Sequence, residues 1–320
     1  MSDSDDVFAH IGLRYDYYPT TAIQLCAIAY DSLAAIASAV STSTGLAVVW
    51  GPAELTRWDG VSYSRAFIAG NAATGDYFVV VRGTYFDSLS SWLQQDFDLG
   101  TATPLATLPG APPGVPGDAL IAHGTFTGMS DLLLLRDPHT GRSMVEFLRD
   151  LGLRYLYVTG HSLGGTLAPV LFAYLNAVLF GGGPTRLMAL WSFAGLTPGG
   201  AGFNGYFNSI LPDSQGFLWR IQNSLDVAPL CWWSLNGIEQ IYLPYELRWG
   251  AIERDLVTDL FGRAAKAAIG YTPAQPGLVM VGAFDRTFVD HTLWTGQALH
   301  QHHPATYQAM VKAQYPDADG

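Results

Sequence analysis

One stretch of this chain constrains its fold more than any other, Val158-Thr159-Gly160-His161-Ser162-Leu163-Gly164-Gly165. An apolar run typical of a strand, residues 154–159, leads into it, and a run compatible with a helix follows from Thr166. Strand, Gly-x-Ser-x-Gly and helix in this order place a serine on a sharp turn above a sheet. A Cβ atom at position 160 or 164 would collide with neighbouring backbone. The helix amides would point at whatever the serine attacks. We therefore predict that Ser162 is a nucleophile; the alternative is a glycine-rich connection with an incidental serine.

Composition limits the classes of partner. The chain has 320 residues, of which 49% are hydrophobic and 13% charged, and this allows a large buried core in one α/β domain. The net charge of −11 argues against nucleic acid as a partner and against attachment to anionic membranes through charge. Apolar contact with lipid stays open. Cys26 and Cys231 lack zinc spacing, and we expect two buried thiols rather than a disulfide.

The N-terminal segment Met1–Asp6 is acidic and lacks the basic-then-apolar order of a secretory signal. We favour secretion, as a mature form or by a signal-independent route, over a cytoplasmic location. The longest apolar run, Leu167–Phe180, carries Tyr174 and Asn176 and follows the serine turn. It therefore predicts a buried core helix and not a transmembrane segment. Pro169 removes a backbone hydrogen bond from this helix and should kink it.

Strands and helices alternate along the rest of the chain. Strands are predicted at 46–50, 65–69, 77–81, 187–193, 217–221 and 278–281. Helices are predicted at 19–40, 143–151 and 252–269 and, with a mixed pattern, at 292–314, and a surface loop is predicted at 101–117. This alternation favours a mainly parallel sheet with helices on both faces. No composition break is evident, so we predict a single domain over residues 1–320.

A serine nucleophile needs a base and an acid that orients the base. In α/β hydrolases the acid follows the serine along the chain and precedes the histidine. Asp226 lies in a short loop just after the strand at 217–221, where open parallel sheets carry their active sites. Asp213 precedes that strand and lies at the wrong edge. Asp226 is therefore the predicted acid, and the alternative is a turn-forming aspartate before Pro229.

The candidate bases are the histidines near the C-terminus, His291, His300, His302 and His303. His302 and His303 fit best, because they follow the last strand and stand just before Pro304. A metal site is the alternative, but no i, i+4 spacing with carboxylate or cysteine partners is evident. We predict no metal and no cofactor.

Two donors must stabilise the oxyanion that forms on the substrate. The first is the backbone N–H of Leu163, the residue after the nucleophile. The second comes from the end of the strand at 77–81, where Gly83 permits close approach and Thr84 offers an N–H and a hydroxyl.

These residues resemble the class 3 lipases, the fungal-type triacylglycerol lipase family, and most of all its bacterial members. Residues 160–165 match the family's G-H-S-L-G-G without change. The other matching segments are Val81–Thr84 (R-G-[ST]), His123–Phe126 (H-x-G-F, with Thr125 in place of a glycine), Ser192–Phe203, Asp226–Pro229 (D-x-x-P) and Gln301–Tyr307 (Q-H-S-P-x-T-Y). The resemblance implies an α/β-hydrolase fold and selects His302 as the base, although a slip of one residue selects His303. The disulfides of the fungal members are not matched, and residues 232–275 do not align.

The family also carries a lid, and Phe86–Asp98 resembles its lid segment, including the lid tryptophan. The pattern of apolar residues predicts the lid at about residues 85–95. Leu89, Trp92 and Leu93 share one face at helical spacing, and Phe86 precedes them. A short amphipathic helix beside Thr84 would cover the site when closed and meet lipid when open. The alternative is an ordinary surface helix.

The sequence therefore predicts a triacylglycerol lipase or carboxylesterase that acts on lipid esters at a lipid–water interface. Ser162 attacks, His302 transfers the proton, Asp226 orients His302, and Thr84 and Leu163 stabilise the oxyanion. A phospholipase A1 or a lipid acyltransferase with the same triad is the enzymatic alternative, and a lipid-binding protein without turnover is the non-enzymatic one. Chain-length preference and oligomeric state stay open.

Overall fold

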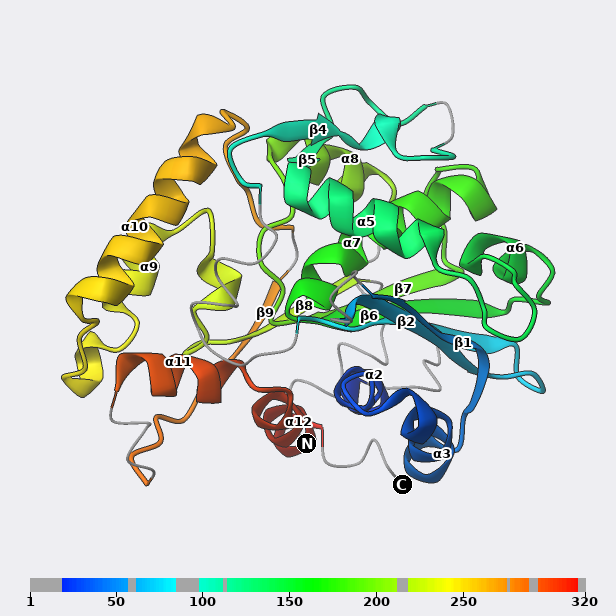
Figure 1. The fold of residues 1–320 in the computed structure, drawn as a ribbon, viewed down its shortest axis with the longest axis horizontal. Coiled ribbons are helices and arrows are strands. Elements are labelled where there is room, and N and C mark those ends of the chain that lie inside the picture. The colour runs from blue at the N-terminus through cyan, green and yellow to red at the C-terminus, as the bar shows by residue number, and fades with distance from the viewer. Residues whose placement is uncertain are drawn as a thin grey trace.

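A computed structural model describes residues 19–56, 62–84, 98–111, 114–211, 218–274, 277–287 and 293–315. Within these residues, seven strands form one sheet in the order β1-β2-β3-β6-β7-β8-β9 (Figure 1). They are β1 (Ala47–Thr56), β2 (Ser62–Asn71), β3 (Asp76–Val81), β6 (Tyr155–His161), β7 (Met188–Phe193), β8 (Leu218–Asn223) and β9 (Gly277–Met280). The first three pair antiparallel, and β3 to β9 pair parallel. The mainly parallel sheet predicted from the sequence is confirmed.

Helices cover both faces of this sheet (Figure 1). One apolar core lies under α5 (His123–Leu134), α6 (Met144–Arg149), α7 (Leu163–Phe180) and α8 (Ala201–Ser209). The other lies under α2 (Pro19–Ile28), α3 (Leu33–Thr44) and α12 (Pro304–Gln314). Central strands between the two cores are buried along their length, since every residue of β3 and β7 is buried. Such strands read as continuous apolar runs, which is why the sequence revealed them.

A third apolar cluster lies beyond the β8–β9 side of the sheet, at the left of Figure 1. It is built from η3 (Ala228–Leu230), α9 (Leu235–Gln240), η4 (Leu243–Tyr245), α10 (Ala251–Lys266) and α11 (Trp294–His302). Much of it comes from residues 232–274, which we call the α9–α10 segment. Leu163 and Leu196 contact the same cluster, so this segment packs beside the serine turn.

The long helix predicted at 19–40 is wrong as one element. Two helices, α2 and α3, are separated at residues 29–32. At this break the Nη1 of the buried Arg65 donates to the carbonyls of Ala29 (3.1 Å) and Asp31 (2.6 Å). Arg65 thus supplies donors to carbonyls that lie between the two helices. The donor lies in a strand that comes later in the chain, so residues 19–40 by themselves do not reveal these hydrogen bonds.

The loop predicted at 101–117 also contains structure. A short strand, β4 (Ala102–Pro104), pairs with β5 (Leu120–Ala122), and a 3-10 turn, η1 (Leu105–Thr107), follows β4. The mixed helical pattern at 292–314 forms two helices, α11 (Trp294–His302) and α12 (Pro304–Gln314). The other predicted strands and helices are found with shifted ends, whereas β5, α5, α8 and α9 were not predicted. Cys26 and Cys231 are unpaired and buried, as expected.

Helix α7 is the one described helix long and apolar enough to be a candidate membrane span, and 78% of its apolar window is buried inside the protein. It is therefore the central core helix that the sequence predicts. It continues through Pro169, which has no N–H to give to the carbonyl of Gly165. The Ser192 hydroxyl of β7 donates to that carbonyl instead, at 2.7 Å. A side chain from the neighbouring strand thus replaces the missing helical bond.

This replacement predicts a coupling between Ser192 and Pro169. Ser192→Ala should lower the free energy of unfolding by about 1–3 kcal/mol, because it leaves the buried Gly165 carbonyl without a donor. In a Pro169→Ala background the helix regains its own donor, and the same Ser192→Ala change should cost clearly less. Urea denaturation of both single variants and the double variant measures this interaction. Strictly additive effects would contradict it.

Candidate active site

The Ser162 turn has the geometry that the sequence predicts. Ser162 has φ 61° and ψ −123°, a strained conformation for a residue with a side chain. A Cβ on Gly160 would lie 2.2 Å from the carbonyl oxygen of Gly164, and a Cβ on Gly164 would lie 2.2 Å from that of Val81. Both glycines are therefore required by backbone packing. The Ser162 N–H donates to the Phe193 carbonyl of β7 (3.0 Å), which fixes the turn to the sheet.

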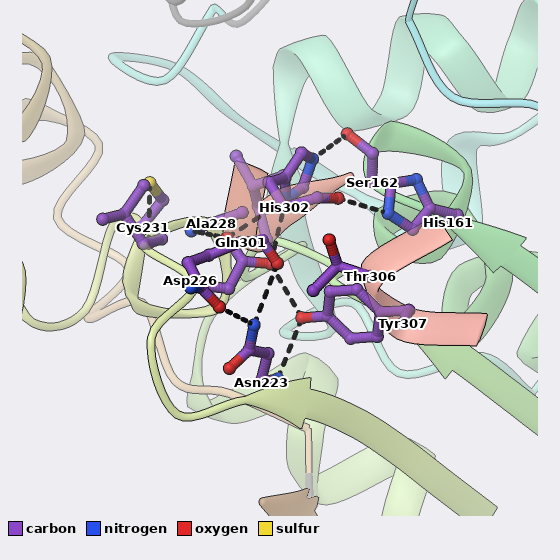
Figure 2. A network of polar contacts seen from close by, with 12 residues as sticks. His161, Ser162, Asn223, Asp226, Ala228, Cys231, Gln301, His302, Thr306 and Tyr307 are labelled. Atoms are coloured by element: carbon purple, nitrogen blue, oxygen red, sulfur yellow. Dashed lines mark hydrogen bonds and ion pairs between the residues drawn. The ribbon is translucent and has the colours of Figure 1, made fainter. Parts of the chain in front are cut away.

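The structure brings Ser162, His302 and Asp226 together in one hydrogen-bonded chain (Figure 2). His302 Nε2 lies 2.9 Å from Ser162 Oγ, and His302 Nδ1 lies 2.9 Å from Asp226 Oδ2. All three residues are at most 1% exposed. An Nδ1–H that donates to the carboxylate leaves Nε2 free to accept the serine proton. The arrangement can therefore turn a hydroxyl into a nucleophile.

The three side chains come from three separate parts of the chain. Ser162 stands between β6 and α7, Asp226 lies in the loop after β8, and His302 is the last residue of α11. All lie at the carboxyl end of the parallel strands, where open sheets form their sites.

Neighbouring histidines have other partners. The Nδ1 of His303 accepts the N–H of Ala305 (3.1 Å) and caps α12. His300 pairs with Asp285 at 3.7 Å. The geometry thus places His302 and not His303 at Ser162, although the sequence left both open. His291 lies outside the described residues.

The two predicted oxyanion residues flank Ser162. Leu163 is the first residue of α7, so its N–H lies at the positive end of the helix. Val81 of β3 pairs with Gly160 of β6, so the chain that follows β3 runs beside the serine turn. A Cβ on Gly83 would lie 3.1 Å from Ser162 Cβ, and Thr84 comes next.

The site is closed to a bulky substrate. Ser162 is fully buried. The cavity beside it, between α5 and α7, measures about 120 Å³ and is lined by Leu163, Leu167 and Gly128 among others. Sites that hold drug-sized ligands usually measure roughly 300–1,000 Å³. A molecule of that size can therefore reach Ser162 only after part of the protein moves. The predicted lid, with Phe86, Leu89, Trp92 and Leu93, lies outside the described residues.

Two solved structures have an architecture similar to that of this chain. The M37 lipase superposes with a TM-score of 0.71 over 92% of this chain and 93% of its own, at 22% sequence identity. A triacylglycerol lipase from Penicillium expansum superposes with a TM-score of 0.51 over 82% of this chain and 78% of its own, at 15% identity. This protein has the α/β-hydrolase fold. No protein-family model matches the sequence, and no curated protein matches it either. The fold class predicted from the sequence is confirmed.

In this α/β-hydrolase fold, Asp226 is held by groups that the sequence did not assign. Tyr307 donates its hydroxyl to Asp226 Oδ2 (2.7 Å), and the Ala228 N–H donates to Oδ1 (2.9 Å) (Figure 2). Burial, and then the Asp226 charge, raise the pKa of Tyr307 well above its ordinary value, so this hydroxyl stays a donor. Tyr307 belongs to the matched Gln301–Tyr307 segment, and this is the signal that could have identified it.

His161 contacts the backbone of His302, the candidate base. Its Nε2 lies 2.8 Å from the His302 carbonyl oxygen, and its Nδ1 lies 3.2 Å from the Tyr30 hydroxyl. Burial, and then the neighbouring His302, lower the pKa of His161 well below the ordinary value of 6.5. The neutral ring can therefore donate to the carbonyl and accept from the tyrosine. Within the described residues, no group of three or more His, Cys, Asp or Glu side chains could hold a metal ion.

The lowered pKa of His161 predicts a pH-dependent stability. The unfolded chain binds a proton on this histidine near pH 6.5, and the folded chain does so only at much lower pH. The unfolded state therefore binds more protons below about pH 6.5, and the free energy of unfolding falls as pH decreases. Replacing His161 by Gln should reduce this slope by up to about 1.4 kcal/mol per pH unit. Urea denaturation between pH 7.5 and 5.5 measures it.

The control for this experiment is the exposed His139. His139→Gln makes the same substitution at a histidine on the surface, and the slope of His161→Gln is compared with it. Equal slopes in the wild type and His161→Gln would contradict the assignment.

Proposed function

We propose that this protein is a serine ester hydrolase that cleaves acyl esters of glycerolipids, a triacylglycerol lipase or carboxylesterase. The observation that supports it most is the buried Ser162–His302–Asp226 chain, with 2.9 Å at both links, on a strained serine turn. The fold agrees with this proposal, because both lipases compared above share it. The net charge of −11 favours neutral glycerides over anionic phospholipids as the surface approached.

The proposed reaction uses the chain's own groups. Ser162 Oγ attacks the carbonyl carbon of the ester, and its proton passes to His302 Nε2. Asp226 stabilises the imidazolium that forms. The carbonyl oxygen becomes an oxyanion and accepts hydrogen bonds from Leu163 N–H and from Thr84, each donor contributing roughly 3–4 kcal/mol to transition-state stabilisation.

The intermediate then breaks down in two stages. The C–O bond to the alcohol breaks, His302 gives its proton to the leaving alkoxide, and an acyl-Ser162 remains. Water next attacks the acyl carbon while His302 accepts its proton, and a second tetrahedral intermediate releases the fatty acid and restores the Ser162 hydroxyl.

Access to Ser162 requires an opening step. Ser162 is fully buried, and the neighbouring cavity of about 120 Å³ is too small for a long acyl chain. We propose that residues 85–95, which follow Thr84 directly in the chain, form a lid that opens at a lipid–water interface.

The test is the rate of tributyrin hydrolysis measured through the solubility limit of this ester. The rate should rise sharply when droplets appear, because the interface stabilises the open lid. Ser162→Ala should be inactive and should not be labelled by a fluorophosphonate, whereas the wild type should be labelled. A smooth saturating curve below the limit would leave an esterase without a lid. An unlabelled wild type would contradict the hydrolase proposal itself.

Activity toward other substrates separates the enzymatic alternatives. We expect faster hydrolysis of tributyrin than of phosphatidylglycerol vesicles, and free fatty acid rather than transferred acyl group when an alcohol acceptor is added. Preferential attack on the vesicles would identify a phospholipase A1, and preferential transfer to the alcohol an acyltransferase.

A further inference from the structure

The α9–α10 segment (residues 232–274) sends one side chain to the loop that carries Asp226. Tyr242, next to η4, is fully buried. Its hydroxyl donates to the carbonyl of Leu225 at 2.7 Å, with both groups buried. Leu225 immediately precedes Asp226, so this hydrogen bond holds the peptide plane from which the acid extends.

The ring of Tyr242 also contacts the start of the helix that carries His302. It lies edge-on to Trp294, the first residue of α11, with ring centroids 5.8 Å apart. A second edge contact, at 6.0 Å, joins it to Phe284 in the segment after β9. His302 is the last residue of the same helix. One aromatic side chain therefore contacts the acid loop by its hydroxyl and the base helix by its ring.

The opposite side of the acid loop is fixed by Asn223 at the end of β8 (Figure 2). Asn223 Oδ1 accepts the N–H of Leu225 (3.0 Å), and the Asn223 carbonyl accepts the N–H of Asp226 (3.0 Å). Its Nδ2 donates to both the carbonyl (3.0 Å) and the side-chain oxygen (2.7 Å) of Gln301, the residue before His302. The sheet thus holds one face of the loop. The Leu225 carbonyl has its donor in Tyr242, not in Asn223.

The Tyr242 hydroxyl is suited to act as a permanent hydrogen-bond donor to the Leu225 carbonyl. Burial, and then the charge of Asp226, raise the pKa of the Tyr242 hydroxyl well above its ordinary value, so it stays protonated and keeps donating. A buried carbonyl without its donor would favour a rotated peptide that finds another partner. Such a rotation would move the Asp226 carboxylate relative to His302.

We propose that Tyr242 is a positioning residue, which holds the Leu225–Asp226 peptide so that the Asp226 carboxylate meets His302. This inference rests on the hydrolase function proposed above. It makes the α9–α10 segment part of the catalytic apparatus, and not only a wall beside the serine turn.

The test compares Tyr242→Phe with a matched control, Tyr271→Phe. Tyr271 lies in the same segment, packs against the same apolar cluster and donates its hydroxyl to another backbone carbonyl, that of Leu99 (3.0 Å). Each substitution removes one hydroxyl and keeps the ring, so the ring contacts that support folding remain. For each variant, kcat and KM are measured with a water-soluble p-nitrophenyl ester, together with the rate of fluorophosphonate labelling and the melting temperature.

Tyr242→Phe should lower kcat and the labelling rate about tenfold, with KM unchanged, as expected from the loss of one buried hydrogen bond that orients the triad. Tyr271→Phe should keep the wild-type kcat, even if its melting temperature falls as far as that of Tyr242→Phe. In an Asp226→Asn background, Tyr242→Phe should cause no further loss of labelling rate, because the carboxylate it positions is already gone.

Three results would overturn the inference while leaving the hydrolase intact. Two of them are equal kcat in the two phenylalanine variants and an undiminished effect of Tyr242→Phe in the Asp226→Asn background. The third is a change confined to KM, since it would place Tyr242 in substrate binding. A wild type that is neither labelled nor active would remove the proposed function itself, and the inference with it.

Discussion

The close contact between the serine turn and two strands is the constraint on which the rest of the structure depends. Gly164 lies against the Val81 carbonyl of β3, and a Cβ on Gly165 would lie 2.4 Å from the Phe193 carbonyl of β7. These approaches put the start of α7 directly onto the sheet. They also hold Ser162 at a positive φ that the residue would not adopt alone. The strain in the turn is therefore maintained by packing on both sides, and packing fixes where the hydroxyl points.

A buried carboxylate beside this turn needs partners, because an isolated buried charge is very unfavourable. Asp226 has them in His302, Tyr307 and the Ala228 N–H. The same hydrogen bonds orient the acid and join the end of β8 to α11 and α12. Fold stability and site geometry therefore depend on one polar network inside an otherwise apolar interior.

That network also explains why the site is closed in this structure. Its members lie where the three apolar clusters meet, with Leu163 and Leu196 in contact with the third. Ser162, His302 and Asp226 are buried there, and burial strengthens the hydrogen bonds between them. The same burial keeps bulky molecules away from Ser162, so chemistry and access make opposite demands on the protein.

Sequence by itself determined the elements whose signals are local. The buried strands are continuous apolar runs, the serine turn is fixed by glycines that tolerate no Cβ, and Asp226 is identified by its place after a strand. The alternation of strands and helices was enough to predict the sheet. Ser162, Asp226 and His302 could be proposed because chain order and a matching motif restrict the choice.

Tertiary structure decided what depends on residues distant in the chain. Arg65 of β2 donates to carbonyls between α2 and α3, and Ser192 replaces the bond that Pro169 removes. The contact of His302 Nε2 with Ser162 Oγ distinguishes His302 from His303. Tyr242 reaches the acid loop from a segment that no motif covers. A hydrogen bond between residues far apart leaves no periodicity or spacing in either segment, so only the folded chain reveals it.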